Sequence, residues 1–591
     1  MCAAAIIRQL SIERFRGIKE VEWKPSEGVN LLLGGGDIGK TTVLDAIALL
    51  LSPTNSFTLS EADYWQKKSD DGFLIRAFVS LPASTDINQQ RALNWPWEWN
   101  GEEALVPALD GGDGDLFDTT DAVYCLQARG TPELELVWEI VQPNDDLVPL
   151  SASLRRLIGI VKLSGEERND RDLRLVYGSA LDRLLADQGL RARIGQEVSK
   201  IDLQTQLSDD GKEALAKLDD ALSKSSLPSS LDIGLISAQG LSIGALVGLL
   251  AKKSEGVLLP LASWGTGTRR MVMLQIAASA QTQSRISVID EVERGLEPYR
   301  VRKLLGSLEG ENTQSFITTH SPVAVEAAIG SQLWYMDTNS AIGELSHKKI
   351  KAHQQRSPLT FLSKLAIVCE GLTEVGLLSV LLEKSIDGCF EDHGIYIADG
   401  EGNSTTLDLL EALSEARLSF AGIVDDEGDA TARWAALKTS MGNRLLQWQD
   451  GNTEANIIGA VPEAQLEQVI LDPEGDKTGD RQRHLALRLG IEDKDMASIR
   501  SALVEQELDL RTVMIAAASG NADGAPDDSA RKAWKKHGQK WFKTKDGGRE
   551  LAGKMITLGA WPELSLQILP VLNAVREACG QTPITDLQDA G

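Results

Sequence analysis

The chain has few cysteines, and they lie far apart. Its 591 residues contain five, at positions 2, 125, 369, 389 and 579, and they lack the short paired spacings of structural zinc sites. The same scatter argues against the disulfide framework of small secreted domains. The chain also lacks a signal-peptide layout and any apolar run of roughly 18–20 residues, the length that spans a bilayer. We therefore expect a soluble, cytoplasmic protein with no membrane partner.

Positive charge is scarce. The chain has 60 Lys and Arg residues against 86 Asp and Glu residues, a net charge of −26. This balance excludes a general electrostatic attraction to nucleic acid, so any contact with DNA must be local. No fixed repeat period and no sustained heptad pattern is present, which excludes a long coiled coil. The length exceeds the roughly 250–300 residues of one hydrophobic core and predicts two or three domains.

Apolar stretches alternate with turn residues at both ends of the chain, which favours an α/β fold class. Between them, leucines at helical spacing, such as Leu215, Leu218 and Leu222, indicate a helical insertion. A polar, Lys-rich stretch reads as a linker. We expect a first α/β domain over 1–150 and 231–345, a helical module over 151–230, a linker over 346–364 and a second α/β domain over 365–591.

A glycine-rich motif follows the first strongly apolar strand. Val29–Leu33 runs into Gly34-Gly35-Gly36-Asp37-Ile38-Gly39-Lys40-Thr41, which matches G-x-x-x-x-G-K-[ST] and precedes a predicted helix from about Lys40 to Leu51. In a P-loop, backbone N–H groups and the helix N-terminus face phosphates, the Lys reaches the β- and γ-phosphates, and the Thr hydroxyl binds Mg²⁺. A strand-to-helix turn without a ligand is the alternative. The predicted cofactor-binding residues are Gly34, Gly36, Asp37, Gly39, Lys40, Thr41 and Thr42.

Two later strands deliver polar groups that suit the same nucleotide. Ile286–Ile289 ends in Asp290 and Glu291, an acid to hold Mg²⁺ and an acid to polarise the attacking water. Ser315–Thr318 precedes His320, which is placed to contact a γ-phosphate. Acids at a solvated strand end and a surface histidine are the alternatives. The order of these residues after a P-loop favours the catalytic interpretation.

A turn of small residues completes this set. Ser263, Gly265 and Gly267 precede a predicted helix and can expose backbone donors to an anion, although a simple helix cap has the same composition. The P-loop, this turn, Asp290-Glu291 and His320, in this order, resemble the ATPase head of the ABC class, especially its RecF/SMC-like branch. The resemblance implies ATP and Mg²⁺ as cofactors. It also implies a homodimer or higher homo-oligomer, in which the small-residue turn of one protomer completes the nucleotide site of another.

Acids follow two apolar strands of the second α/β domain, Leu365–Cys369 and Phe420–Val424. Acidic strand ends in one α/β unit can converge on a divalent cation, although solvated strand ends look the same in a sequence. The acids that we predict as metal ligands here are Glu370, Glu374, Asp425, Glu427 and Asp429.

These acids resemble a known fold. Glu370-Gly371-x-x-Glu374 and Asp425-x-Glu427 resemble the two motifs of the Toprim fold. An ABC head joined through a linker to a Toprim domain resembles the OLD (overcoming lysogenization defect) family, which includes the Gabija nuclease subunit. The resemblance implies an ATP-regulated, metal-dependent DNA endonuclease with a dimerising helical module. It also suggests a role in antiphage defence and a UvrD-like helicase as a partner.

The resemblance also implies a two-ion mechanism, with Mg²⁺, Mn²⁺ or Ca²⁺ at the Toprim site. Glu370, Asp425 and Glu427 would surround one ion. Glu374 would serve the other ion, together with an acid from a later segment, Glu463 or Glu467.

A basic segment lies near the end of the acidic chain. Residues 531–545 contain many Lys and Arg residues and no acid. Lys543 or Lys545 would neutralise a transition-state phosphate. The interleaved Trp534, Trp541 and Phe542 either stack on bases or pack into the core of a basic amphipathic helix.

Two other functions compete with the nuclease. One is a non-nucleolytic, RecF/SMC-like ATPase whose second domain only binds DNA. The other is a topoisomerase- or primase-like use of Toprim. A topoisomerase requires a nucleophilic tyrosine, and the chain has six tyrosines, none in a recognisable context.

Overall fold

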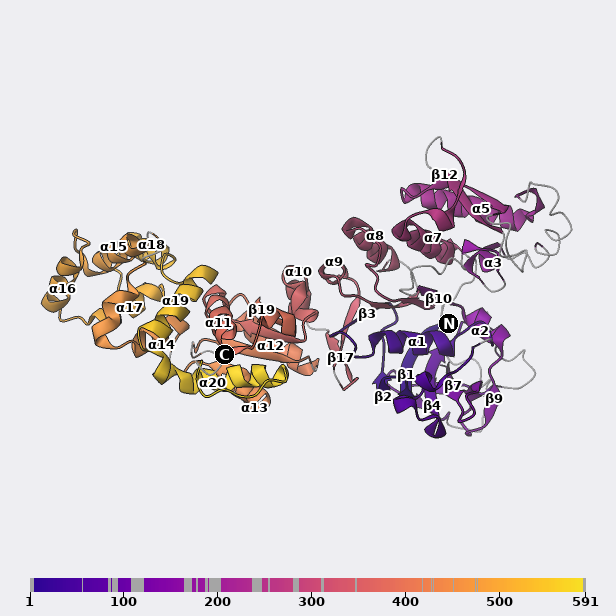
Figure 1. Cartoon of the computed structure of the whole chain (residues 1–591), viewed down its shortest axis with the longest axis horizontal. Helices are drawn as coiled ribbons and strands as arrows, with labels where there is room; N and C mark the ends of the chain where they lie inside the picture. The colour runs from indigo at the N-terminus through magenta and orange to yellow at the C-terminus, as the bar shows by residue number, and fades with distance from the viewer. Residues whose placement is uncertain are drawn as a thin grey trace. The chain divides into compact units, whose positions relative to one another are not determined.

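The computed structural model describes residues 5–587 except 56, 83–84, 86, 88–93, 108–121, 164–172, 177–178, 186–189, 191–203, 236–246, 253–255, 280–285, 310–312, 338, 346–347, 417, 427, 429, 450, 473–474 and 476. Two predicted ligands, Glu427 and Asp429, therefore lie outside the described residues. The chain divides into two compact α/β units, Met1–Glu344 and Leu345–Gly591 (Figure 1). Among the described helices, none is both long enough and apolar enough to cross a bilayer.

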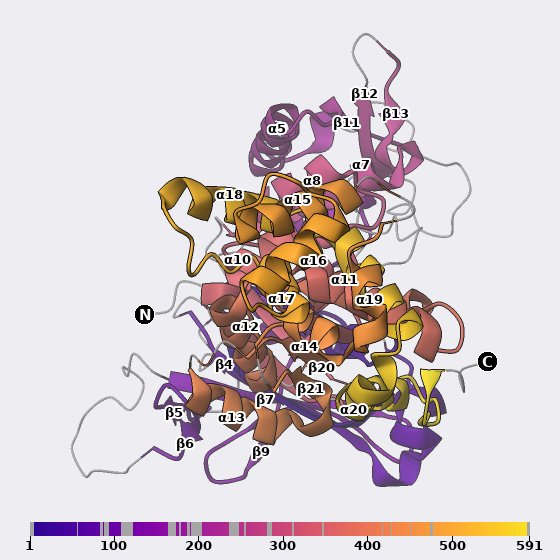
Figure 2. The same cartoon turned by 90° about the vertical axis from the view of Figure 1, so that its left-hand side faces the viewer.

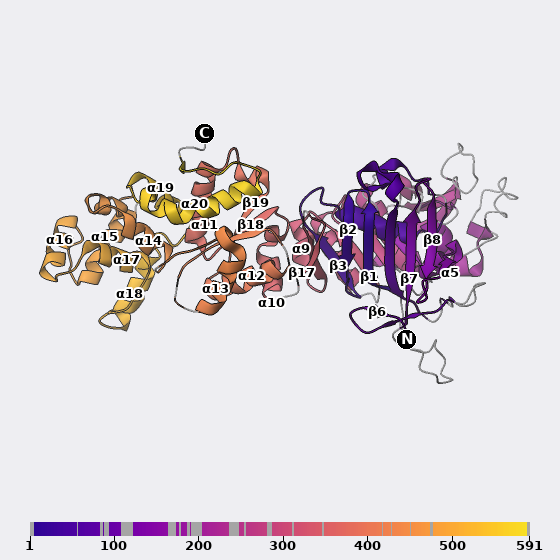
Figure 3. The same ribbon diagram turned by 90° about the horizontal axis from the view of Figure 1, so that it is seen from below.

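An antiparallel sheet opens the first unit. Its strands follow the order β2, β1, β4, β7, and β7 also pairs with β8 and β5 (Figure 3). In β1 a register shift between Ile7 and Gln9 keeps Ile7 and Leu10 on the buried face, although their spacing breaks strict alternation. The bounds are β1 Ile6–Phe15, β2 Ile18–Trp23, β4 Phe73–Ser80, β5 Trp97–Trp99, β6 Ala104–Leu105, β7 Ala122–Gly130, β8 Leu136–Val141 and β9 Leu147–Pro149.

A second sheet carries the P-loop. Its order is β10, β14, β15, β3, β16, β17, and the pairs from β10 to β16 are parallel. Helix α1 contacts strands of both sheets and buries Val43, Leu44 and Ile47, so it forms a layer between them. The bounds are β3 Val29–Leu33, α1 Lys40–Leu50, β10 Ile160–Leu163, β14 Ile286–Ile289, α8 Pro298–Glu309, β15 Gln314–Thr318, α9 Pro322–Ala327, β16 Gln332–Met336 and β17 Ile342–Leu345.

Helices α3, α5 and α7 pack on one another (Figure 1). Helix α5 also packs on β11 of a small antiparallel sheet of β11, β12 and β13 (Figure 2). The leucine spacing of α5 is helical, as predicted. The predicted module over 151–230 is wrong at its start, because Gly159 ends α2 and the apolar run Ile160–Leu163 becomes the edge strand of the P-loop sheet. The bounds are α2 Ala152–Ile158, α3 Ala180–Leu185, α5 Asp209–Lys224, β11 Ser229–Leu235, β12 Val247–Lys252, β13 Leu259–Pro260 and α7 Thr266–Ser279.

The second unit is built on a parallel sheet in the order β19, β18, β20, β21. Residues 346–364, predicted as a linker, begin this unit as α10 (Lys348–Arg356) and a short 3-10 turn. Polar composition was misleading, because the fully buried Ile350 and Phe361 anchor the segment and α10 packs on α12. The bounds are β18 Leu365–Cys369, α11 Leu372–Ser385, β19 Ile395–Asp399, α12 Asn403–Glu415, β20 Phe420–Val424, α13 Thr431–Met441 and β21 Leu445–Gln447.

A helical region completes the second unit, and one of its helices, α19, packs closely on α11. Glycines permit this contact. A Cβ atom on Gly548 would lie 2.0 Å from the carbonyl oxygen of Thr373, and one on Gly376 would lie 2.0 Å from that of Lys545. The bounds are α14 Thr453–Ala460, α15 Lys477–Leu489, α16 Met496–Glu505, α17 Leu510–Ala518, α18 Asp528–Gly538, α19 Lys545–Thr557 and α20 Trp561–Ala578.

Two glycines of α19 provide a matched test of this packing. Gly548→Ala should lower the free energy of unfolding by about 3 kcal/mol, because the added methyl meets backbone that cannot move aside. Gly553→Ala in the same helix has no atom within 4 Å of the new Cβ and should stabilise by ~0.5–1 kcal/mol. Urea unfolding of the full chain, with hydrogen exchange to locate the change, measures both. Equal effects would contradict the close approach.

Candidate functional site

The P-loop turn has the backbone that its glycines allow. Gly34 has a φ of +142° and Gly39 a φ of +104°, and a Cβ on Gly34 would lie 2.5 Å from the carbonyl oxygen of Met336. Lys40 begins α1, and its Nζ donates to the carbonyl oxygens of Gly34 at 2.9 Å and Gly35 at 2.5 Å. The ammonium is thus held across the turn where a phosphate would bind.

Burial changes the charge of this lysine. It lowers the pKa of Lys40 to about 8, although the nearby carboxylates of Asp290 and Asp37 raise that pKa. An anionic ligand would favour the charged form, because an opposite charge at close range raises the pKa of an ammonium. The turn is therefore electrostatically suited to a polyphosphate.

The predicted magnesium ligands come together. The hydroxyl of Thr41 donates to both carboxylate oxygens of Asp290 at 3.2 Å. Asp290 follows β14 and also accepts from the hydroxyl of Thr318 at 2.5 Å. A hydroxyl and a carboxylate in contact at the start of α1 form the pair that binds Mg²⁺ in P-loop proteins, so the side chains fit the ion. Thr318 was missed by the sequence analysis, although it lies two residues before His320.

Glu291 and His320 lie at neighbouring strand ends. Glu291 has a φ of +47°, and its N–H donates to the Thr318 hydroxyl at 2.9 Å. Its carboxylate is partly exposed and contacts Arg294 at 3.2 Å. His320 is exposed, and its N–H donates to Glu293 at 2.7 Å. Both predicted catalytic side chains therefore remain accessible to a ligand.

The small-residue turn abuts the segment that follows these acids. A Cβ on Gly267 would lie 2.1 Å from the carbonyl oxygen of Gly295, so α7 packs directly on this segment. Arg270, buried on α7, donates to the carbonyl oxygens of Asp290 and Arg294. Ser263 donates to the carbonyl of Pro260 at 2.7 Å, and Gly265 has open space beside it.

In the second unit, acids gather at one edge of the parallel sheet, because the carboxyl ends of parallel strands meet there. Glu370 directly follows β18, Asp425 directly follows β20, and Glu454 lies in the first turn of α14 after β21. Glu374 lies in the first turn of α11. Their exposed fractions are 8% for Glu370, 4% for Glu374, 8% for Asp425 and 0% for Glu454. We call these four residues the acid cluster.

Within the acid cluster, a hydrogen bond links Glu370 to Asp425. Glu370 Oε2 accepts from the N–H of Asp425 and from Nδ2 of Asn403, both at 2.9 Å. Asp425 Oδ1 accepts from the N–H of Thr453 at 2.9 Å and from its hydroxyl at 3.0 Å. The amide of Asn403 is oriented by the indole N–H of Trp434, which donates to Asn403 Oδ1 at 3.1 Å.

Glu374 and Glu454, the other two members of the acid cluster, accept from different donors. Glu374 Oε2 accepts from the N–H of Gly371 at 3.0 Å. Glu454 Oε1 accepts from Lys543 Nζ at 2.9 Å and from the Thr373 hydroxyl at 3.2 Å. Glu454 Oε2 is buried without a hydrogen-bond partner. Glu454 was missed by the sequence analysis, because six residues separate it from β21, whereas Glu370 and Asp425 follow their strands directly.

Burial and mutual repulsion shift the pKa values of this cluster. Burial, followed by the charges of Asp425 and Glu454, raises the pKa of Glu374. Burial, followed by the charges of Glu370 and Glu454, raises the pKa of Asp425. Burial alone would lower the pKa of Lys543, but the acids, Glu454 first, raise it overall. The cluster therefore favours the presence of a cation.

The residues fit a divalent cation chemically. Carboxylate oxygens are the ligands that Mg²⁺ and Ca²⁺ prefer, and the unpartnered Glu454 oxygen is available as a ligand. In the described part of the chain, no three His, Cys, Asp or Glu side chains are already arranged as ligands of one ion. Cation binding would thus require these side chains to move toward a common point.

The later acids predicted as ligands lie elsewhere. Both carboxylate oxygens of Glu467 accept from Arg500, at 2.6 and 2.5 Å, and Glu463 accepts from Arg511 at 2.9 Å. The inward positions of this segment are taken by apolar side chains, including Leu466, which is 1% exposed. Glu467 and Glu463 are thus each paired with an arginine, whereas Glu454 lies in the acid cluster.

The basic segment divides into two parts. The rings of Trp534, Trp541 and Phe542 are buried, so the core alternative holds for these aromatics and base stacking is excluded. Lys543 reaches the acid cluster, whereas Lys545 is exposed in the first turn of α19. Exposed cations of α18, among them Lys535 and Lys536, face solvent.

A comparison with known protein families matches the part of the first unit that carries the acids of the nucleotide site. Residues 143–326, which include Asp290 and Glu291, match a family described as "AAA domain, putative AbiEii toxin, Type IV TA system". The first unit contains an ABC-like ATPase domain.

Matches to curated proteins are short. A stretch of 44 residues, 7% of this chain, is 50% identical to the DNA replication and repair protein RecF of Nitrosococcus oceani and covers 12% of it. A stretch of 178 residues, 30% of this chain, is 26% identical to translation initiation factor IF-2 of a Ruegeria species and covers 21% of it. The chain thus spans about a fifth or less of these relatives.

Similar solved structures include an SMC head bound to the C-winged helix domain of ScpA, with 14% identity and a TM-score of 0.37, covering 59% of this chain and 99% of that chain. The SMC head domain from Thermotoga maritima has 14% identity and a TM-score of 0.29, covering 58% and 100%. The recombination mediator RecF with ATP has 13% identity and a TM-score of 0.35, covering 58% and 99%. These TM-scores are low, so no argument follows from them.

Substitutions at the P-loop separate binding from hydrolysis. Lys40→Ala should abolish binding of a fluorescent ATP analogue, because the cation across the phosphate turn is lost. Glu291→Gln should retain binding but slow phosphate release by about 100-fold, the contribution of a general base. The control is Glu297→Gln, which removes an acid whose partner is Arg300 at 3.1 Å. A Glu291→Gln variant that hydrolyses ATP at the wild-type rate would contradict the assignment.

Proposed function

We propose that the protein is an ATP-regulated, divalent-metal-dependent DNA endonuclease. The observation that carries this proposal is the acid cluster: four carboxylates buried together at the carboxyl edge of a parallel sheet, with one lysine in contact. Burying a carboxylate costs free energy, since each buried charge must be paired or neutralised. A site for a cation and a phosphodiester gives the cluster a chemical purpose.

We assign the acids of the cluster to two pairs of metal ligands and Lys543 to the phosphate. Divalent ions bound by such carboxylates activate water and stabilise the leaving oxygen in phosphodiester hydrolysis. Glu370 and Asp425 are linked through hydrogen bonds and would act as one ligand pair. Glu374 and Glu454 would form the other pair, and Glu427 and Asp429 remain candidates from the sequence. Lys543, held by Glu454, would neutralise charge on the phosphate.

The ATPase domain supplies the regulatory part of the proposal. The segment 293–296 lies between the acids of the nucleotide site and the turn at Ser263, Gly265 and Gly267. We expect that turn to contact ATP bound by a second protomer, so that ATP closes a homodimer. ATP would then act on cleavage by selecting one of two arrangements.

A second candidate is a non-nucleolytic ATPase that binds DNA. One observation favours it: in the described residues, the acids are hydrogen-bonded to N–H groups and are not arranged around a common point. In that case the acid cluster would be a structural feature of the second unit.

Substitution of the acids decides between these two functions. Glu370→Gln and Asp425→Asn should each lower cleavage of plasmid DNA in Mg²⁺ or Mn²⁺ by more than about 100-fold, and chelation should abolish it. The control is Glu467→Gln, which should stay within about twofold because Arg500 already pairs that acid. Wild-type cleavage by Glu370→Gln would reject the nuclease and leave the DNA-binding ATPase.

The exposed cations of α18 should contact the DNA backbone. Helix α18 packs on α15. Partial burial, together with the charges of Arg483 of α15, Lys536 and Lys540, lowers the pKa of His537, although Asp480 raises it. We expect a phosphate-binding surface there. Lys535→Glu/Lys536→Glu should weaken DNA binding and reduce the slope of log affinity against log salt by about 2, close to one per lost phosphate contact.

The matched control changes the same charge elsewhere. Lys384→Glu/Lys438→Glu alters exposed lysines of α11 and α13 in the same unit. It should leave the salt slope unchanged. Equal losses of affinity in both double variants would show that net charge, rather than the α18 surface, governs binding.

A further inference from the structure

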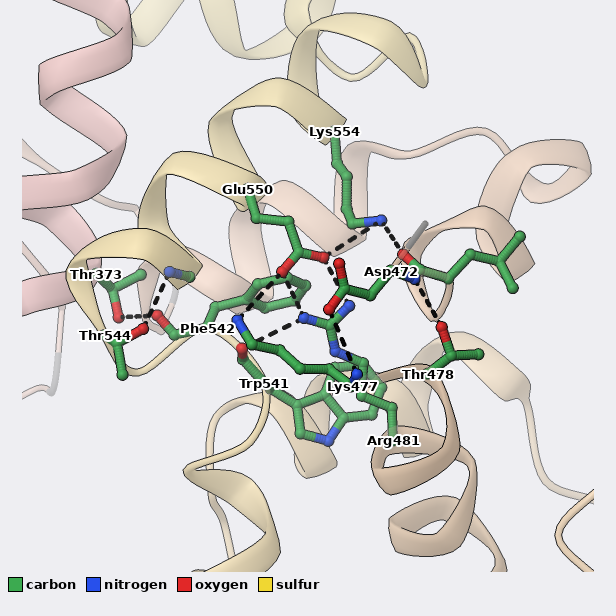
Figure 4. Close-up of polar contacts among 12 residues, drawn as sticks. Thr373, Asp472, Lys477, Thr478, Arg481, Trp541, Phe542, Thr544, Glu550 and Lys554 are labelled. Atoms are coloured by element: carbon green, nitrogen blue, oxygen red, sulfur yellow. Dashed lines mark hydrogen bonds and ion pairs between the residues drawn. The ribbon is translucent and has the colours of Figure 1, made fainter. Parts of the chain in front are cut away.

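A fully buried arginine contacts the two residues that precede Lys543 in the chain. Arg481 of α15 is 0% exposed. Burying a guanidinium is costly unless its N–H groups are paired. NH1 and NH2 donate to the two carboxylate oxygens of Glu550 on α19, each at 2.6 Å. The guanidinium carbon also lies 4.7 Å from the ring centre of Phe542 (Figure 4).

Two lysines also lie close to the carboxylate of Glu550, the group that accepts from Arg481. Lys554 Nζ lies 3.5 Å and Lys477 Nζ 3.7 Å from carboxylate oxygens of Glu550. Lys554 also donates to the carbonyl oxygens of Gln468 and Leu471. The Arg481–Glu550 ion pair therefore joins α15 to the middle of α19. Lys554, which contacts Glu550, is itself held by two backbone carbonyl groups. A bidentate pair of this kind also defines an orientation, because the guanidinium fork is planar and rigid.

The ion pair holds one particular turn. Arg481 NH2 donates to the carbonyl oxygen of Trp541 at 3.4 Å, and the Trp541 indole N–H donates to His484 of α15 at 3.1 Å. From the opposite side, the hydroxyl of Thr373 donates to the carbonyl oxygen of Phe542 at 3.0 Å. The turn is thus held on both faces, and its next residue is Lys543.

We propose that Arg481 and Glu550 are positioning residues that fix the Trp541–Thr544 turn, so that Lys543 reaches the acid cluster. This inference rests on the proposed role of Lys543 in DNA cleavage. Lys543 lies in an irregular turn before α19, and neither helix geometry nor a strand fixes its backbone. A displacement of about 1 Å at a reacting group can cost about 100-fold in rate. Neither Arg481 nor Glu550 needs to contact DNA.

A double-mutant cycle tests the inference. Arg481→Met should lower kcat for DNA cleavage by about 100-fold and leave the KM for DNA nearly unchanged. In a Lys543→Ala background, Arg481→Met should lower kcat no further, because residues that act through one another are not additive. Arg481→Lys, which keeps charge but loses the fork, should restore only part of the rate. If Arg481→Met lowers kcat by the same factor in both backgrounds, the positioning role is overturned.

A second readout does not depend on activity. Hydrogen exchange of the full chain should become faster at residues 541–548 in Arg481→Met. The control is Arg576→Met, which removes another buried arginine of this unit, 3% exposed and bonded to Thr582, Ser385 and Asp387. It should leave exchange at 541–548 unchanged. Unchanged exchange in Arg481→Met would overturn the inference.

Further variants distinguish a failure of the nuclease proposal from a failure of the positioning proposal. Arg481→Met removes the bidentate partner of Glu550, whose side chain is 19% exposed. Arg481→Met/Glu550→Leu, which removes both charges, therefore provides a variant that is expected to fold. This pair should also lose kcat and exchange faster at 541–548; wild-type values would overturn the inference. If the wild-type protein cleaves no DNA, the proposed nuclease fails. If it cleaves and Lys543→Ala is fully active, only the role of Lys543 and of its positioning residues fails.

Discussion

The repulsion among four buried carboxylates is the constraint on which the second unit depends. Charges close together in a low-dielectric interior interact far more strongly than they do in water. Glu370, Glu374, Asp425 and Glu454 stay together because donors compensate them: backbone N–H groups, the amide of Asn403 and the ammonium of Lys543. The ammonium of Lys543, which the sheet edge does not supply, comes from the turn before α19. The helical region thus completes the site as well as packing on the sheet.

The charges of neighbouring acids are compensated in both units, but by different kinds of group. Both place acids at the carboxyl ends of parallel strands. In the first unit, Asp290 and Glu291 are partly exposed, and the compensating groups are Thr41, Thr318 and Lys40 on adjoining strands and α1. In the second unit, the acids are buried and the compensating lysine comes from a turn far along the chain. In the first arrangement the compensating groups lie on the P-loop sheet and on α1, the helix that the P-loop begins. The second arrangement requires packing of separate helices through Gly376, Gly547 and Gly548.

This difference explains how much the sequence predicts. Strands β3, β14, β18 and β20 have the bounds expected from their apolar runs, and the acids after them were identified because each follows such a run directly. Glu454 follows the short strand β21 after a six-residue gap and was missed. Glu467 was chosen as an acid of a later segment for the second ion that the resemblance implies, and it pairs with Arg500. The strand β10 and the helix α10 were missed because a few apolar residues in polar surroundings give little periodicity. Lys543 was identified by charge, but its partner depends on contacts between distant helices.

The acid cluster also sets a condition on any DNA that approaches it. Four carboxylates repel a phosphate backbone, and the chain as a whole adds to that repulsion with its net charge of −26. Attraction must therefore come from fixed local cations, which α18 and the Lys543 turn provide, or from bound metal ions. Because a divalent ion cancels the charge of two carboxylates, metal binding and DNA binding should favour each other at this edge. The same argument explains why the cations of residues 531–545 stand together: spread over an acidic surface, they would be cancelled one by one.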